Sequence, residues 1–198
     1  MVSADAPLSD GEVRRRRNRG RWTLILIALL FFAPIWLAMY LVQHWRPEGT
    51  VNNGVLVDPL QPVVGLEARA LDGSQLPSGF FEGQWTLVYS LDSACDEPCE
   101  LAIYHMRQVR LALGKDMDRV QRLLLLRAVP SPSLLRNLED NYAGMDLVVA
   151  DSNGPFDIPE AIHVVDPVGN LMMYYPQNTL PKGMIKDLKR LLKLSKLG

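Results

Sequence analysis

The stretch WTLVYSLDSACDEPC, residues 85–99, decides the fold of this chain. Residues 85–91 form an apolar run with the length of a buried strand, and the two cysteines of the chain, Cys95 and Cys99, follow shortly after it. If a helix starts at this pair, a thiol lies in its first turn, where backbone N–H groups and the helix dipole favour the thiolate. The C-x-x-x-C pair is therefore predicted to be either a redox couple or two ligands for a soft metal.

The elements expected around this stretch predict an α/β protein. Upstream, Asp72-Gly73-Ser74 is typical of a hairpin turn. Downstream, Gly114 is expected to cap the C-terminus of the helix that follows the cysteines. The remaining elements are expected at 120–129 (strand), 132–144 (helix), 146–150, 161–165 and 171–175 (strands) and 181–197 (helix). This order predicts a thioredoxin-like sandwich, a central mixed sheet with flanking helices.

An uncharged segment near the N-terminus predicts a transmembrane helix. Residues 22–45 carry no formal charge, and their core from Leu24 to Val42 is long enough to cross ~30 Å of hydrocarbon. The apolar stretch exceeds a signal-peptide core, and bulky residues follow it in place of a small-residue cleavage site. We therefore expect one retained anchor at residues 22–45.

The charge around this helix predicts the topology. Arg14 to Arg17 and two further arginines precede it, so the positive-inside rule predicts a cytoplasmic basic stub at 1–21. Residues 46–61, rich in Pro, Gly and Asn, are expected to be a tether, and residues 62–198 a periplasmic domain held at a bacterial inner membrane. The net charge of −1 leaves that outer part the more acidic, which argues against nucleic acid as a partner. In an oxidising compartment the cysteine pair should close to a disulfide unless a reductant or a metal holds it open.

The strand Thr86-Leu87-Val88-Tyr89 leading to Cys95-x-x-x-Cys99, after a Leu71-Asp72-Gly73 hairpin, resembles the Sco family of membrane-anchored copper chaperones for cytochrome c oxidase. The similarity runs from about Pro62 to the C-terminus. It implies that the two cysteines bind copper together with a distal histidine, and that the thiols can reduce a disulfide on the copper-receiving subunit. The implied partners are a cytochrome c oxidase subunit or another copper or thiol assembly factor.

The distal histidine of that family is missing here. When the family's Pro-x-Gly turn is aligned with Pro167-Val168-Gly169, Ile158 stands where the histidine belongs. His163, five residues later in an expected strand, remains as a candidate ligand, although a shift of five residues in a strand reverses the face. The alternative is a half-buried strand histidine. The pair Ile158-Pro159 also resembles the cis-proline site of thioredoxin-like folds, and both the cis and the trans isomer are open.

Acidic neighbours shape the chemistry expected of the cysteines. Asp96, Glu97 and Glu100 disfavour a reactive thiolate but suit Cu(I), which two thiolates can bind without further ligands. The leading interpretation is a degenerate Sco-like factor that assists cytochrome c oxidase assembly by copper or thiol handling. Two alternatives remain: a general membrane-tethered thiol-disulfide oxidoreductase, and a non-catalytic assembly scaffold with a structural disulfide.

Overall fold

The structure is a computed structural model that describes residues 10–44, 52–91 and 95–195. The chain divides into two compact units, Met1–Thr50 and Val51–Gly198, and each is described by itself. The first part of the basic stub, Trp45, residues 46–51 of the expected tether and the end of the expected last helix lie outside the described residues.

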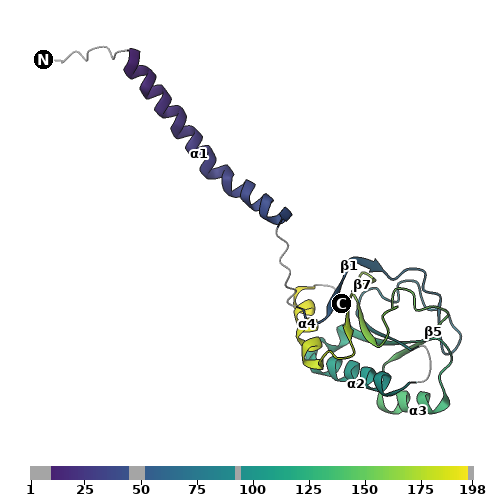
Figure 1. Cartoon of the computed structure of the whole chain (residues 1–198). Coiled ribbons are helices and arrows are strands. Elements are labelled where there is room, and N and C mark those ends of the chain that lie inside the picture. The colour runs from purple at the N-terminus through teal and green to yellow at the C-terminus, as the bar shows by residue number, and fades with distance from the viewer. Residues whose placement is uncertain (1–9, 45–51, 92–94, 196–198) are drawn as a thin grey trace. The chain divides into compact units, whose positions relative to one another are not determined.

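The first unit contains one long helix, α1 (Asp10–His44, 35 residues) (Figure 1). Its 24 residues Asn18–Leu41 are long and apolar enough to cross a membrane, and none of them is buried by other parts of the protein. The helix begins before the expected Trp22, because the arginine-rich stretch upstream is itself a good helix former. It supplies the single-pass membrane anchor that the composition predicts.

The second unit is built on a seven-stranded mixed sheet in the order β1-β7-β6-β3-β4-β5-β2. β3 pairs parallel with β4, and β4 pairs parallel with β5. The other neighbours pair antiparallel. The strands are β1 (Val55–Pro62), β2 (Ala68–Ala70), β3 (Trp85–Leu91), β4 (Val120–Leu126), β5 (Asp146–Ala150), β6 (Ala161–Val165) and β7 (Asn170–Pro176).

Three helices pack against one face of this sheet. They are α2 (Glu97–Ala112), α3 (Pro132–Asn141) and α4 (Pro181–Leu194), and a short 3-10 helix, η1 (Gly114–Arg119), follows α2. α2 and α3 connect the parallel strands β3, β4 and β5, and right-handed crossovers in one direction put both helices on the same face. Their buried side chains share a core with Leu87, Tyr89 and Leu124 of the sheet.

The opposite face of the sheet has its own core, without a helix among the described residues. Val88, Leu123 and Leu125 pack there against Phe81 and Phe156, which come from the segments that precede β3 and β6. The sheet is therefore buried on both faces, which explains why β4 ends in four consecutive buried leucines, Leu123 to Leu126. The expected thioredoxin-like sandwich is confirmed.

The strand β1 lies in the segment that the composition predicts to be a tether. It covers Val55–Pro62 and pairs antiparallel with β7, with an irregular register between Leu56 and Gln61. Pro59 and Pro62 indicate a linker in the sequence, but an edge strand tolerates prolines because one side of it needs no ladder hydrogen bonds. The expected boundary at residue 62 is thus wrong, since the folded unit already includes β1.

A buried carboxylate joins the start of this unit to its last helix. Asp187 of α4 is 4% exposed and accepts hydrogen bonds from the Asn53 backbone N–H (2.7 Å), the Asn53 side-chain amide (2.8 Å) and the Gly54 backbone N–H (3.1 Å). Tyr175 of β7 donates to the same carboxylate at 3.5 Å. Burial, together with the charge of Asp187, raises the pKa of Tyr175. Asp187 therefore ties the chain that enters β1 to α4 and β7.

We expect Asp187→Ala to lower the free energy of unfolding by about 2 to 3 kcal/mol, because buried N–H donors lose a charged acceptor. Urea unfolding of the full chain in detergent micelles, followed by near-ultraviolet circular dichroism, measures this change. The control Asp140→Ala removes an exposed carboxylate from α3 and should alter the same quantity by less than about 0.5 kcal/mol. Equal effects of the two substitutions would contradict the anchoring role.

Candidate thiol-disulfide site

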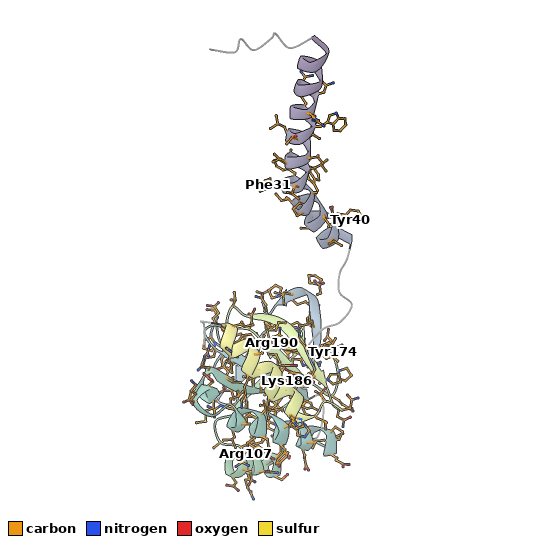
Figure 2. All side chains as sticks on the ribbon, turned by 90° about the vertical axis from the view of Figure 1, so that its left-hand side faces the viewer. Phe31, Tyr40, Arg107, Tyr174, Lys186 and Arg190 are labelled. Atoms are coloured by element: carbon orange, nitrogen blue, oxygen red, sulfur yellow. A yellow bond between two sulfur atoms is a disulfide. The ribbon has the colours of Figure 1, made fainter. Side chains whose placement is uncertain are left out.

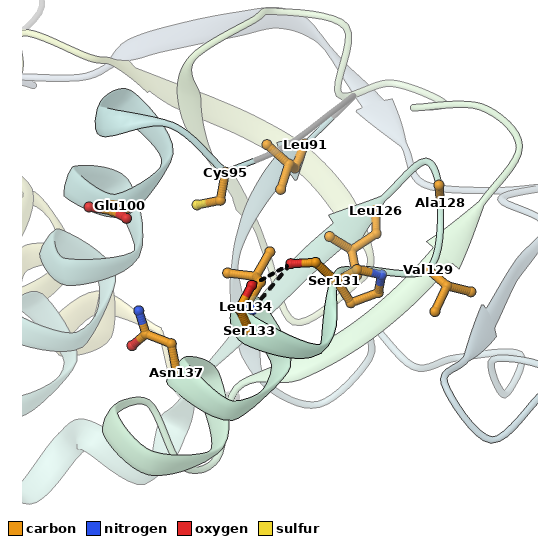
Figure 3. Close-up of a pocket in the computed structure, with 11 residues that line it drawn as sticks. Leu91, Cys95, Glu100, Leu126, Ala128, Val129, Ser131, Ser133, Leu134 and Asn137 are labelled. Atoms are coloured by element: carbon orange, nitrogen blue, oxygen red, sulfur yellow. Dashed lines mark hydrogen bonds between the residues drawn. The ribbon is translucent and has the colours of Figure 1, made fainter.

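The candidate site lies where β3 and β4 end. The two strands are parallel, so their carboxyl ends meet at one edge of the sheet, the usual place for a site in an α/β fold. The last residue of each strand, Leu91 and Leu126, lines a cavity of about 570 Å³ (Figure 3). Cys95, which follows β3, lines the same cavity.

Local sequence explains why α2 begins beside the cysteines. Asp96 is the N-cap, and its side chain accepts a hydrogen bond from the backbone N–H of Cys99 at 3.3 Å. Pro98 stands in the first turn, where its missing N–H costs no hydrogen bond. The cap fixes Cys99 in the first turn of α2. The Cys99 side chain is completely buried in the core between α2 and the sheet.

Cys95 and Cys99 form a disulfide, with their Cα atoms 5.2 Å apart. This is the closed pair predicted for an oxidising compartment. The two sulfurs differ in environment, because Cys99 is 0% exposed whereas Cys95 is partly exposed. Figure 3 shows the Cys95 side chain among the residues that line the cavity. A reagent can therefore approach the disulfide from the side of Cys95.

The cavity walls combine apolar and hydrogen-bonding groups. Ser131 caps α3, since its hydroxyl accepts from the Leu134 backbone N–H at 3.3 Å, and it also lies 3.0 Å from the Ser133 hydroxyl. The apolar lining residues are Leu91, Leu126, Ala128, Val129, Pro130 and Leu134, and the polar ones besides the two serines are Glu100 and Asn137. A wall of this composition offers both apolar contacts and hydrogen-bonding groups to a molecule that enters the cavity.

Sequence reasoning missed most of this cavity wall. It identified Cys95 and Glu100 but none of the residues from 128 to 137 as part of a site. The available signal was the capping serine and the proline that open α3 directly after the leucine-rich strand. That signal predicts a helix start, and only the crossover geometry brings the helix start next to Cys95.

Carboxylates surround the end of β3. The pKa of Tyr89 in β3 is raised to about 12, mainly by burial and to a smaller extent by the negative charges of Asp96 and Glu160. Glu97 and Glu100 add two more acidic side chains in the first turn of α2. The local potential is therefore negative, which attracts cations and disfavours a thiolate.

His163 lies on the other face of the sheet from Cys99. It is opposite Val88 in the β3–β6 register, and its ring centroid is 5.4 Å from that of Phe156. Val88 and Phe156 both belong to the core on the sheet face without helices among the described residues. Cys99 belongs to the core between the sheet and α2, α3 and α4. In this structure His163 is not a third ligand beside the cysteines, because strand alternation turns it away from them. Of the two interpretations, the strand histidine agrees with the structure, although the residue is fully buried.

His163 is buried without a good hydrogen bond. Neither ring nitrogen has a partner of adequate geometry among the described residues. Burial lowers the pKa of His163 to about 4, and the backbone groups of Val88 and Ala161 only partly offset this effect. The imidazole is consequently neutral at physiological pH.

The family's histidine position falls in the loop that precedes β6. Ile158 is half-buried there, and the bond Ile158–Pro159 is trans, since the cis peptide bond in the described chain is Asp58–Pro59. Glu160, at the end of this loop, lines a small crevice together with Pro98 of α2. The loop therefore borders the start of α2, as the alignment with the Sco pattern implies. No group of three or more His, Cys, Asp or Glu residues in the described chain is arranged to hold a metal ion.

Fold and site together define a membrane-anchored thioredoxin-like protein with a redox-capable cysteine pair at the start of a helix. A family model described as "Transmembrane-like, thioredoxin-like, C-terminal domain" matches residues 85–195, more than half of the chain. A second one, "Transmembrane-like, N-terminal domain", matches residues 14–44. The chain belongs to this transmembrane-like, thioredoxin-like family. A comparison with curated protein sequences gives no match.

Solved structures with a similar fold include several Sco proteins, as the resemblance predicts. Yeast Sco1 superposes with a TM-score of 0.56 at 14% identity, over 66% of this chain and 93% of that one. Copper-bound ScoI from Bradyrhizobium japonicum gives a TM-score of 0.51 at 17% identity, over 63% and 96%. BsSco, described as a member of the Sco family of cytochrome c oxidase assembly proteins, gives 0.52 at 16% identity, over 69% and 96%. At these identities the likeness establishes the fold.

After reduction, we expect Cys95 to react with iodoacetamide about tenfold or more faster than Cys99, because only Cys95 is accessible in the folded chain. Peptide mass spectrometry after brief alkylation measures the two rates. The same labelling in urea is the control and should remove the difference. Equal rates in the folded protein would show that the two sulfurs are equally exposed.

The buried His163 predicts a loss of stability in mild acid. Its pKa is lower in the folded chain (about 4) than the ordinary 6.5, so between these values the unfolded state binds the additional proton. The free energy of unfolding is therefore not reduced by His163 above about pH 6.5. It declines by about 3 kcal/mol as the pH falls from there toward 4. Urea unfolding of the full chain at a series of pH values measures this decline.

His163→Leu should remove most of that pH dependence, because leucine does not titrate. The control His105→Gln changes a half-exposed histidine on α2 whose pKa burial also lowers, and it should remove a smaller part of the pH dependence than His163→Leu does. If wild type and His163→Leu lose stability equally between pH 6.5 and 5, other groups are responsible.

Proposed function

We propose that this protein is a membrane-anchored thiol-disulfide factor that assists the assembly of cytochrome c oxidase, acting on a cysteine pair or on Cu(I) carried by a partner. The observation that supports it is the closed Cys95–Cys99 pair, with one buried sulfur and one sulfur that lines a cavity of about 570 Å³. The similarity of the fold to BsSco, described as a cytochrome c oxidase assembly protein, supports the choice of client.

The proposed reaction is thiol-disulfide exchange through Cys95. In the reduced protein, the Cys95 thiolate attacks one sulfur of a client disulfide and forms a mixed disulfide, while the other client sulfur leaves as a thiolate and takes up a proton. The Cys99 thiol then loses its proton and attacks Cys95, which releases the second client thiol and closes Cys95–Cys99. Two electrons pass to the client, and a separate reductant must reopen the pair for another cycle.

The donor set also allows transient carriage of Cu(I) as a substrate. Two thiolates from Cys95 and Cys99 suit this soft ion, and the surrounding carboxylates favour its positive charge. Cu(II) does not fit, because neither candidate position supplies an imidazole: Ile158 occupies the family's position, and His163, opposite Val88, lies on the other face of the sheet. The arrangement therefore favours thiol exchange or brief Cu(I) transfer over stable copper storage.

The proposed setting is the periplasmic side of a bacterial inner membrane, because Arg14 to Arg17, near the start of α1 and before its apolar span, favour a cytoplasmic N-terminus. A disulfide is stable on the outer side of that membrane and would be reduced in the cytoplasm. The proposal thus links the state of the cysteine pair to the orientation of the anchor.

The test is a Cu(I) competition titration of the reduced full chain. We expect one Cu(I) to bind, no binding by Cys95→Ser or Cys99→Ser, and unchanged affinity in His163→Ala. Ile158→His should raise the Cu(I) affinity about tenfold or more and introduce Cu(II) binding, because it restores an imidazole next to the start of α2.

Two results would redirect the proposal. If wild type binds no copper but Cys95–Cys99 equilibrates readily with glutathione, the protein is a general thiol-disulfide oxidoreductase. If the pair neither binds copper nor exchanges with glutathione, the disulfide is structural and the protein is a scaffold.

The orientation is tested with an alkaline phosphatase fused after Gly198 in a bacterial host. The phosphatase should be active, because it requires an oxidising compartment to form its disulfides. Replacing Arg14 to Arg17 with glutamate should reduce this activity, since the orienting charge is lost. Replacing four exposed cations of the outer domain with glutamate is the control and should leave the activity unchanged. An inactive fusion to the wild-type chain would place the domain in the cytoplasm.

A further inference from the structure

α4 carries a row of exposed basic side chains along one side. Its apolar side, with Met184, Leu188 and Leu192, is buried in the core. The basic residues that are exposed on the other side are Lys182, Lys186, Lys189, Arg190 and Lys193. Their spacing along the helix brings them to one face, here called the α4 basic face. Figure 2 shows Lys186 and Arg190 on this helix.

Among the described residues, no ion pair compensates the charge of this face. The one acidic residue in the sequence of α4, Asp187, is buried and engaged with Asn53 and Gly54. None of the five cations takes part in an ion pair with another described residue. Two exposed leucines flank the row, Leu180 at 75% and Leu194 at 73%. A row of uncompensated cations flanked by apolar side chains is the composition of surfaces that bind anionic membranes.

The chain itself keeps this face near a membrane. α1 ends at His44, and nine residues later Asn53 is hydrogen-bonded to Asp187 in the middle of α4. Nine residues span at most about 32 Å when fully extended. Asn53 therefore cannot lie further than this from the end of α1, and its hydrogen bonds to Asp187 hold α4 next to it, so the effective concentration of the α4 basic face at the bilayer surface is high.

We propose that the α4 basic face binds the headgroups of anionic phospholipids in the bilayer that holds α1. The electrostatic attraction between a juxtamembrane basic cluster and anionic headgroups acts within about a Debye length, and the short tether keeps the cluster close to the bilayer surface. Lipid is favoured over an acidic protein because the anchor supplies the bilayer at all times. Docking would hold the folded unit against the membrane in one arrangement. The proposal rests on the anchor and not on the chemistry of the cysteines.

The experiment uses the full chain in nanodiscs of phosphatidylcholine alone, or of phosphatidylcholine with about a third phosphatidylglycerol. Lysines are acetylated sparsely with a water-soluble reagent and quantified by peptide mass spectrometry. In anionic discs at low salt, the α4 lysines should react about fivefold or more slowly than in neutral discs, and about 0.5 M salt should remove the difference. Lys115, exposed outside this face, is the internal control and should react at the same rate throughout.

Charge-neutral variants test whether the face itself is responsible. Lys186→Gln, Lys189→Gln and Arg190→Gln together should abolish the protection of Lys182 and Lys193 in anionic discs. The matched control of Arg69→Gln, Arg107→Gln and Arg136→Gln removes three exposed cations elsewhere and should leave the protection intact. Unfolding midpoints check that both variants are folded.

Two outcomes would overturn the proposal. One is an equal reaction rate of the α4 lysines in neutral and anionic discs; if this equal rate is lower than that of Lys115 in both, a protein partner or self-association covers the face. The other is protection that survives the α4 variant.

Discussion

The parallel pairing of β3 with β4 is the constraint on which the rest of the outer unit depends. Successive side chains of the two strands supply both cores, so each face of the sheet must be covered. Two parallel neighbours require a crossover, and its right-handed path puts α2 on the same face as α3 and α4. The same pairing aligns the carboxyl ends of both strands, so the segment with Cys95 and the start of α3 lie beside one cavity.

The site that results is asymmetric in its two sulfurs. The cap by Asp96 and the packing of α2 bury Cys99, whereas Cys95 remains partly exposed at the cavity. An asymmetric pair of this kind suits stepwise exchange, in which one sulfur meets the client and the other resolves the intermediate. With Ile158 at the family's histidine position and His163 on the other face of the sheet, the described pair offers two thiolates, which suit a soft monovalent ion. The Sco-like fold is thus combined with a reduced set of donors.

Local signals explain which parts could be predicted from the sequence. The apolar run of β3, the helix start at the cysteine pair and Gly114 after that helix are features of neighbouring residues, and all of them match the structure. The face of His163 follows from strand parity alone. The strand β1 could not be predicted, because its partner β7 lies more than a hundred residues away and its prolines indicate a linker. The cavity wall and the complete burial of His163 depend on how distant elements pack, which no local pattern encodes.

The central claim is that Cys95 is the sulfur that meets a client in the cell. Trapping tests it most directly: Cys99→Ser leaves Cys95 without its resolving partner, so a mixed disulfide with a client should persist and be recovered from membranes after acid quenching. We predict that Cys99→Ser yields a reductant-sensitive adduct with a cytochrome c oxidase subunit or one of its copper or thiol assembly factors, and that Cys95→Ser yields none. An adduct through Cys99 in the Cys95→Ser variant, or no adduct in either variant, would contradict the account.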